Sequence, residues 1–394
     1  MDLFDKCKNF TRAKEFMALG LYPYFRPIES GAGSEVLIHG KKMIMIGSNN
    51  YLGLTGHPKV IEAAVAAVRK YGTGCTGSRF LNGTLDIHET LEHRLASFMK
   101  CEAALCFSTG FQTNQGVIST MAGKNDLIFT DRADHASIVD GCRLAFGKTV
   151  KYKHNDMADL ERVLKSHGDS DNGKLIATDG VFSMEGDIVQ LPRLVELAEE
   201  YGARIYLDDA HSIGVLGKHG RGTGEHWNLE DRVDMVMGTF SKSFASLGGF
   251  VAGSEPVIHY IKHHARALIF SASMPPSAVA TVIACLDIIE SEPERLEQLW
   301  KNTRKMKAEF DRMGFDTGHS QTPIIPIKIG KDEDCFAFWN LLSEEGIFAN
   351  PSISPAVPPG EAIIRTSYMA THTDEELDKV LAIFKKLGKR LGLI

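Results

Sequence analysis

The stretch VDMVMGTFSKS (residues 233–243) decides how this sequence is interpreted. An apolar run ends at Met237, and Thr239, Ser241 and Lys242 follow within five residues. Ligands of open α/β folds bind at the carboxyl ends of strands, so this order predicts an amine at the mouth of a sheet. The two hydroxyl groups are donors of the kind that a phosphate needs. Burial disfavours the charged form of a lysine, which lets the neutral amine act as a nucleophile and a base.

Two interpretations of Lys242 follow from this placement. In the functional one, the lysine forms a Schiff base with pyridoxal 5'-phosphate (PLP). In the other, it is a solvated loop lysine, which is the usual state of this residue type. Other segments of the chain have to decide between them.

Outward from this stretch, short β-rich runs alternate with helical patterns between about residues 41 and 291. This alternation predicts an α/β fold with a mainly parallel sheet covered by helices. A long charged helix, short strands and a terminal helix then predict a smaller α+β domain. Because 394 residues exceed what one hydrophobic core usually fills, we expect an N-terminal arm (1–40) with a helix at about 4–19, a large domain (41–291) and a small C-terminal domain (292–394).

Composition excludes several classes of function. The formal net charge of −6 argues against nucleic acid as a partner. The seven cysteines are scattered without zinc-ligand or C-x-x-C spacing, so reduced thiols, no metal and a cytoplasmic location are expected. The sequence shows no secretory signal, and no apolar stretch reaches the roughly 18 residues of a spanning helix, so we expect no integral membrane segment.

The run RIYLDDAH (residues 204–211) places Asp208 at the end of a second predicted strand. A buried carboxylate there could keep a pyridine nitrogen protonated, which makes the ring an electron sink. The rival interpretation is a metal-binding acidic pair of a nucleotide hydrolase. That class requires a phosphate loop ending in Gly-Lys-Ser/Thr, and the nearest candidate, GTGCTGSR (72–79), has no lysine in the required place.

Further polar residues follow predicted strands. STGFQTN (108–114) opens a helix, where free N–H groups can bind an anion and Gly110 permits close approach. His135 could stack on a pyridine ring, or it could be a structural residue at a helix start. Ser183 could donate to the phenolic oxygen of the cofactor, or it could lie in a polar turn. Arg365 ends an apolar strand and suits bidentate capture of a carboxylate, with help from Asn49, although a surface ion pair is the usual role of an arginine.

The run HETLEH (residues 88–93) does not form a zinc motif. Its histidines are five residues apart, whereas a shared helix face needs four. Both are expected to be solvated helix residues.

Taken together and in order, nine segments resemble the α-oxoamine synthases, PLP enzymes of the aminotransferase-like fold type I. They are SNNYLGL (48–54), GTGCTGSRFLNGT (72–84), STGFQTN (108–114), DHASIVDG (134–141), TDGVFSMEGD (178–187), LDDAHSIGVLG (207–217), GTFSKSFASLGG (238–249), FSASMPP (270–276) and PPGEAIIRTS (358–367).

The resemblance implies a role for each matching residue. Lys242 would be the Schiff-base lysine, Asp208 would pair with the ring nitrogen, and His135 would stack over the ring. The remaining expected cofactor contacts are Ser183 and His211 at the phenolic oxygen, Gly110, Phe111, Thr239 and Ser241 at the phosphate, and Ser271 or Ser273 reaching the phosphate from the other subunit of a homodimer. The expected substrate-binding residues are Asn49, Ser78 and Arg365.

The resemblance also implies a decarboxylating condensation of an amino acid with an acyl-CoA. GSNNYLGL (47–54), SRFLNGT (78–84) and YFRP (24–27) are most similar to soluble bacterial members that join L-serine to a long-chain acyl-CoA such as palmitoyl-CoA. A sibling synthase that uses glycine or alanine, of the 2-amino-3-ketobutyrate CoA ligase or 8-amino-7-oxononanoate synthase type, is the alternative. A catalytically silent partner subunit would be expected to lack Lys242.

Overall fold

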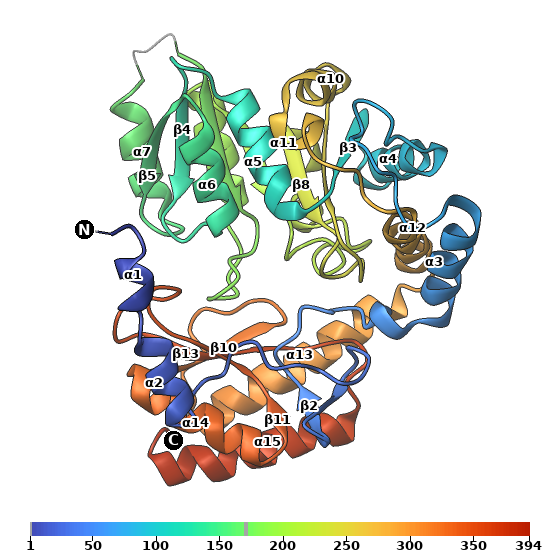
Figure 1. Cartoon of the computed structure of the whole chain (residues 1–394). Coiled ribbons are helices and arrows are strands. Elements are labelled where there is room, and N and C mark those ends of the chain that lie inside the picture. The colour runs from blue at the N-terminus through green and yellow to red at the C-terminus, as the bar shows by residue number, and fades with distance from the viewer. Residues whose placement is uncertain (1, 169–171) are drawn as a thin grey trace.

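The computed structural model describes residues 2–168 and 172–394. A seven-stranded sheet with the order β3-β9-β8-β7-β6-β4-β5 occupies the upper half of the molecule in Figure 1. The neighbouring strands from β8 to β5 run parallel, and β9 is antiparallel to β8 and β3. The prediction of an α/β fold with a mainly parallel sheet is confirmed. The strands are β3 (Ala103–Phe107), β4 (Leu127–Asp131), β5 (Lys148–Tyr152), β6 (Lys174–Asp179), β7 (Arg204–Asp208), β8 (Met235–Thr239) and β9 (Gly249–Gly253).

Helices cover both faces of this sheet, which explains why β4, β8 and β9 are buried along their whole length. Successive side chains of a strand point to opposite faces. Tyr206 therefore packs with α5 (Gly110–Met121), α6 (Ala136–Leu144), α10 (Glu255–His264) and α11 (Arg266–Ile269). Its neighbours Ile205 and Leu207 pack with α7 (Met157–Lys165) and α8 (Leu191–Glu200).

A second group of helices completes the sheet-bearing half. These are α3 (Pro58–Tyr71), α4 (Asp86–Met99) and α12 (Pro276–Ser291), and a short helix, α9 (Thr223–Trp227), lies before β8. The buried face of α4 corrects one expectation, because His88 lies on it with Leu91 and Leu95 and is fully buried. Its ring accepts from the N–H of Leu85 and lies 3.0 Å from the Met274 carbonyl. His88 is thus a structural residue, whereas His93 is exposed as expected.

The lower half has its own core and its own sheets. One sheet has the antiparallel order β10-β13-β12, formed by Ile324–Gly330, Ala362–Ser367 and Asn350–Ser352. The other joins β1 (Glu35–Ile38), β2 (Lys41–Met45) and β11 (Ile347–Phe348). The packed helices are α13 (Glu294–Met313), α14 (Asp332–Glu344) and α15 (Asp374–Leu391).

The pairing of β2 with β11 bears on the predicted boundaries. Strand β2 opens the predicted large domain, yet it pairs with Ile347–Phe348 of the C-terminal region. Residues 41–45 therefore lie with the small domain rather than with the seven-stranded sheet. The division into 1–40, 41–291 and 292–394 otherwise stays a prediction.

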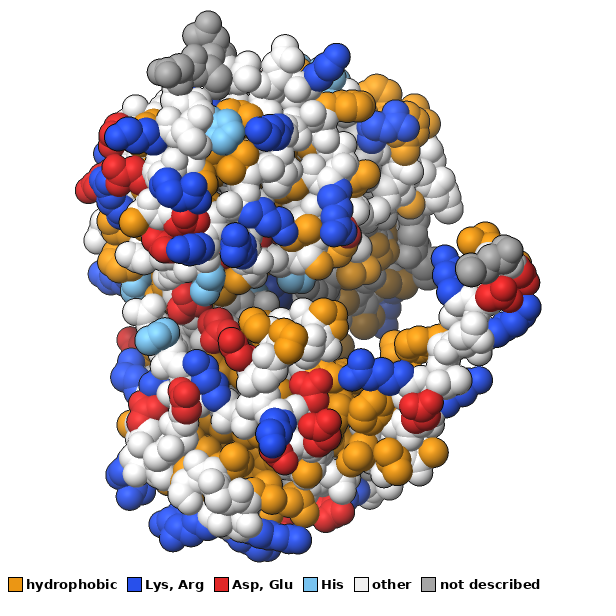
Figure 2. Space-filling model, turned by 90° about the vertical axis from the view of Figure 1, so that its left-hand side faces the viewer, with side chains coloured by type: hydrophobic (Ala, Val, Ile, Leu, Met, Phe, Trp, Pro, Cys, Tyr) orange, Lys and Arg blue, Asp and Glu red, His pale blue; other side chains and the backbone are white. Residues whose placement is uncertain are grey.

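The N-terminal arm holds two short helices, α1 (Asp5–Lys8) and α2 (Arg12–Ala18), so the expectation of one helix at 4–19 was wrong. Neither helix has a buried residue, and short helices without tertiary packing are marginal. In Figure 2 the arm projects from the body of the molecule at the right. Among the residues described, no helix is long and apolar enough to cross a bilayer.

Candidate active site

A cavity of about 260 Å³ lies at the carboxyl ends of β7 and β8 and at the start of α5. Parallel neighbouring strands bring their carboxyl ends to one edge, so residues that are distant in sequence meet here. The structure brings eight of the predicted residues together in its wall: Gly110, Phe111, His135, Asp208, His211, Thr239, Ser241 and Lys242.

Lys242 is positioned by the turn that follows β8. Burial lowers the pKa of its amine to about 8, although the nearby carboxylates of Asp208 and Asp179 favour the charged form. The charge of Arg365 adds to the lowering. A substantial fraction of the amine is therefore neutral near pH 7 to 8, which suits a nucleophile and base.

The carboxylate of Asp208 is buried and held in one orientation. Its Oδ1 accepts from the N–H of Ala210 at 2.9 Å, and its Oδ2 accepts from the Asn114 amide at 2.6 Å. Tyr206 donates to Oδ1 of Asn114 at 2.6 Å, which fixes that amide in turn. Sequence reasoning missed Asn114 and Tyr206. Asn114 lies one helical turn after Gly110, and Tyr206 lies two residues before Asp208. Each therefore shares a face of its helix or strand with a predicted site residue, and this spacing could have pointed to both.

His135 caps the start of α6 and has a defined tautomer. Its Nδ1 accepts from the N–H of Ser137 at 3.2 Å. Burial lowers the pKa of the imidazole, with Asp208 acting in the opposite direction. A neutral ring that accepts at Nδ1 carries its proton on Nε2. The Asp179 carboxylate accepts from the backbone N–H of His135 at 2.7 Å.

Hydroxyl and backbone donors meet at the other end of the cavity. The hydroxyls of Thr239 and Ser241 lie 3.0 Å apart, and Thr109 caps α5 by accepting from the N–H of Gln112. The backbone at Gly110 comes so close that a Cβ there would lie 2.7 Å from Oγ1 of Thr239. A helix start with adjacent hydroxyls is an anion site. The phosphate, ring nitrogen and aldehyde of PLP thus fit the donors, carboxylate and amine present.

Arg365 and Asn49 reach the site from other parts of the chain. Nε of Arg365 donates to the Ser183 carbonyl at 2.6 Å, and Nη2 donates to Oδ1 of Asn49 at 3.0 Å. Tyr51, which sequence reasoning missed, places its hydroxyl 2.7 Å from Nδ1 of His211. Burial and the charge of Lys242 hold the pKa of His211 well below its usual value, and Arg365 contributes to this shift. Ser183 therefore meets Arg365 through its carbonyl oxygen.

Six predicted residues lie outside the wall of this cavity: Asn49, Ser183 and Arg365, described above, and Ser78, Ser271 and Ser273. Ser271 accepts from the side-chain amide of Gln112 at 3.0 Å, and Ser273 donates to the Gly77 carbonyl at 3.0 Å. Ser78 forms a β-bridge with Ala272, and its hydroxyl is buried with no hydrogen-bond partner in the described chain. These serines gather beside the start of α5. Their roles across a subunit interface and toward substrate stay predictions.

Comparison with known proteins places the chain in a family. Residues 41–384 match the family described as aminotransferase class I and II. The chain belongs to the class I and II aminotransferase family. The predicted resemblance to PLP enzymes of fold type I is confirmed.

Individual members of this family resemble the chain over its whole length. It is 54% identical to a serine palmitoyltransferase from Sphingobacterium spiritivorum, covering 98% of this chain and 97% of that protein. It is 45% identical to an 8-amino-7-oxononanoate synthase from Thermoanaerobacter pseudethanolicus, covering 97% of each. A solved serine palmitoyltransferase from S. paucimobilis, with a bound PLP–myriocin aldimine, matches with a TM-score of 0.96 and 36% identity over 100% of both chains.

Proposed function

We propose that this chain catalyses the PLP-dependent condensation of L-serine with a long-chain acyl-CoA such as palmitoyl-CoA. The products are 3-ketodihydrosphingosine, CoA and CO₂, in the first step of sphingolipid synthesis. The observation that carries the proposal is one cavity holding the Lys242 amine, the Asp208 carboxylate and the hydroxyls of Thr239 and Ser241. The choice of serine rests on the greater identity to a serine palmitoyltransferase than to an 8-amino-7-oxononanoate synthase.

When bound, PLP supplies an electron sink for the negative charge that develops at Cα of the amino acid. The start of α5 with Thr239 and Ser241 would hold the phosphate. Asp208, oriented by Asn114, would keep a proton on the ring nitrogen. Lys242 would hold the cofactor covalently, and its amine, when free and neutral, would take the proton from Cα of the bound serine.

The substrate is positioned by two further groups. Arg365 and Asn49, which are hydrogen-bonded to each other, bind the serine carboxylate. His135 would stack over the ring and would donate from Nε2 to the substrate carboxylate or to the incoming thioester carbonyl, because its Nδ1 is already used as an acceptor. Cα of serine bonds to the thioester carbonyl carbon as the C–S bond to CoA breaks. The bond from Cα to the carboxylate then breaks to release CO₂, and Cα takes up a proton.

The proposal includes a cytoplasmic homodimer with shared active sites. Ser271 or Ser273 of one subunit would approach the phosphate in the other. Phe270 lies on the segment 270–276 with these serines, and Phe80 and Leu81 lie on the segment 78–84 that forms a β-bridge with it. The exposed apolar side chains of these three residues support a subunit interface here.

A lysine substitution tests the chemistry. In Lys242→Ala, turnover and the visible absorbance of covalently held PLP should both disappear, because Lys242 is the only lysine among the described residues that line the cavity. Lys262→Ala, at an exposed site on α10, should retain both. Full turnover in Lys242→Ala would contradict the mechanism.

A substrate panel tests the specificity. Titration of the PLP-loaded enzyme with L-serine, glycine and L-alanine should change the cofactor absorbance most readily with L-serine. Product masses from an acyl-CoA series should then show the long-chain keto product. A clear preference for glycine or alanine with a short acyl-CoA would favour the sibling synthase instead.

A further inference from the structure

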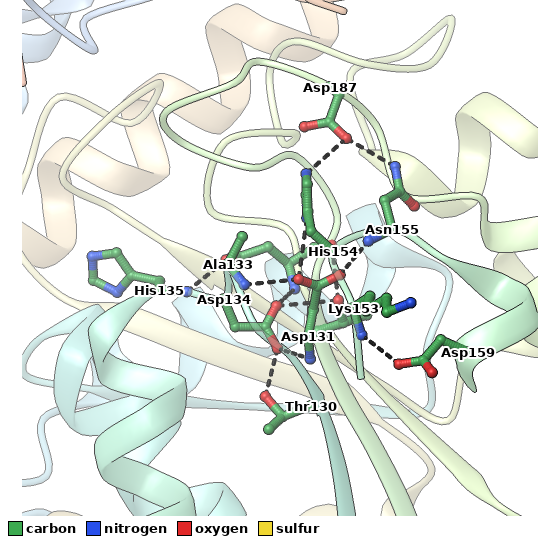
Figure 3. Close-up of polar contacts among 12 residues, drawn as sticks. Thr130, Asp131, Ala133, Asp134, His135, Lys153, His154, Asn155, Asp159 and Asp187 are labelled. Atoms are coloured by element: carbon green, nitrogen blue, oxygen red, sulfur yellow. Dashed lines mark hydrogen bonds and ion pairs between the residues drawn. The ribbon is translucent and has the colours of Figure 1, made fainter. Parts of the chain in front are cut away.

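His154 lies between two buried carboxylates, at the corner after β5. Its Nδ1 is 3.1 Å from Oδ1 of Asp131, and its Nε2 is 3.4 Å from Oδ2 of Asp187 (Figure 3). Burial opposes a charge on the ring, but the hydrogen bonds to the two carboxylates outweigh it and raise the pKa of His154 to about 10. With a carboxylate facing each nitrogen, the protonated ring forms an ion pair on both sides.

One of these carboxylates belongs to a turn of residues 182–187. The turn is closed by hydrogen bonds from the N–H of Phe182 to the Asp187 carbonyl and from the N–H of Gly186 to the Phe182 carbonyl. The ring of His154 also packs edge-on against Phe182, with centroids 4.4 Å apart. His154 therefore contacts this turn through both an ion pair and an aromatic ring.

The same turn also contacts the residues before β10 and the guanidinium of Arg365. The Gly186 carbonyl accepts from the N–H of Gln321 and from the hydroxyl of Thr322, just before β10. The Ser183 carbonyl accepts from Nε of Arg365. The turn thus connects His154 on the large sheet with the guanidinium of Arg365 on β13.

The ion pair matters to the turn because Asp187 has few other partners. Its Oδ2 accepts from the Asn155 amide at 2.8 Å, whereas its Oδ1 is buried without a hydrogen bond from the described residues. A buried carboxylate that loses its cation is strongly destabilised, so the chain around it rearranges.

We propose that His154 is a positioning residue for Arg365: its imidazolium ties the 182–187 turn to Asp131, and the turn holds the guanidinium through the Ser183 carbonyl. The role assigned to Arg365 rests on the proposed function. His154 itself lies outside the wall of the cofactor cavity.

The test is the affinity of PLP-loaded His154→Gln for L-serine, read from the cofactor absorbance. The dissociation constant should rise about tenfold, since a displaced guanidinium binds the carboxylate less well. Binding of 2-aminoethanol, which lacks the carboxylate, should change less than about twofold, and PLP affinity should be retained. Asp187→Asn, which keeps the shape but removes the charge, should reproduce the loss if His154→Gln folds poorly.

A double variant distinguishes a positioning role of His154 toward Arg365 from general damage to the fold. In an Arg365→Lys background, His154→Gln should weaken serine binding less than about twofold, because residues that act through one contact are not additive. His219→Gln removes a histidine from a comparable pair with Glu225 and should leave serine affinity unchanged. Equal losses for serine and 2-aminoethanol, or additive losses in the double variant, would overturn the proposal.

If the proposed function is wrong, the binding measurements differ from those expected if His154 does not position Arg365. Glycine and L-alanine carry the same carboxylate, so the loss in His154→Gln should appear with whichever amino acid the wild type binds. A wild type that prefers glycine contradicts the choice of serine and still supports positioning by His154 if that loss appears. A wild type that responds to no amino acid overturns both proposals.

Discussion

Buried carboxyl groups lie in and beside the cavity around Lys242, and two of them, Asp179 and Asp208, line its wall. Burial and the neighbouring Asp208 raise the pKa of Asp179 well above its usual value. Burial and Asp131 raise the pKa of Asp134 to about 8. Asp208 accepts hydrogen bonds from the Asn114 amide and from the N–H of Ala210, which fix the orientation of its side chain. Asp208 thus presents an oriented acceptor at the position where a pyridine nitrogen would lie.

The lowered pKa of Lys242 predicts how the apoenzyme captures PLP. Only the neutral amine attacks an aldehyde, and its fraction rises with pH up to the pKa of about 8. The rate of covalent capture should therefore rise about tenfold per pH unit below 8 and level off above it. Rapid-mixing absorbance, corrected for free PLP, measures this rate. A rise that continues to pH 10 would show an unperturbed lysine.

At the scale of elements, the start of α5 and the end of β8 approach so closely that only glycine fits between them. A Cβ at Gly110 would meet Oγ1 of Thr239 at 2.7 Å, and a Cβ at Gly249 would meet the Gly110 Cα at 2.7 Å. The contact places the backbone N–H groups of a twelve-residue helix beside the hydroxyls of Thr239 and Ser241. The anion site is thus a product of helix–strand packing.

A methyl group at this contact should separate the two halves of the anion site. We expect Gly110→Ala to weaken PLP binding at least about tenfold and to lower stability by about 1–3 kcal/mol. Equilibrium dialysis and thermal unfolding measure the two effects. Gly31→Ala is a suitable control, because no heavy atom lies within 4 Å of the added Cβ. Unchanged PLP affinity in Gly110→Ala would show that the phosphate of PLP does not bind at this contact.

At the scale of the whole molecule, α3 presents an apolar stripe to solvent. Ile61, Val65 and Val68 are 50%, 43% and 38% exposed and share one helix face. The buried residues of α3, Val60 and Ala67, lie on a neighbouring face of the helix, and α3 packs against α12 at the right of Figure 1. An apolar stripe of this kind is suited to contact with a second copy of the chain.

Interruption of the stripe should therefore weaken the proposed homodimer. Val65→Glu would place a charge in a desolvated interface, so we expect monomer at micromolar concentration and loss of most activity if the sites are shared. Light scattering coupled to gel filtration gives the mass. Leu391→Glu, at an exposed position on α15, should leave the mass unchanged. A dimeric Val65→Glu would mean that α3 lies outside the interface.

The fold and the meeting of Asp208, Thr239 and Lys242 in one cavity could be predicted from the sequence for the same reason. Asp208 and Thr239 end the neighbouring parallel strands β7 and β8, and Lys242 follows in the next turn. Parallel strands bring their ends together whatever their exact packing, so local patterns were sufficient. The N-terminal helix was mispredicted because periodicity reports an apolar face but not whether that face is covered.

The sequence by itself determined the sheet, the order of its strands along the chain and the residues at their ends, since these depend on local patterns. Only the tertiary structure decided that Asn114 orients Asp208, that Tyr51 meets His211, and that His154 reaches Arg365 through a turn. These contacts join segments up to about two hundred residues apart, and packing rather than local pattern selects them.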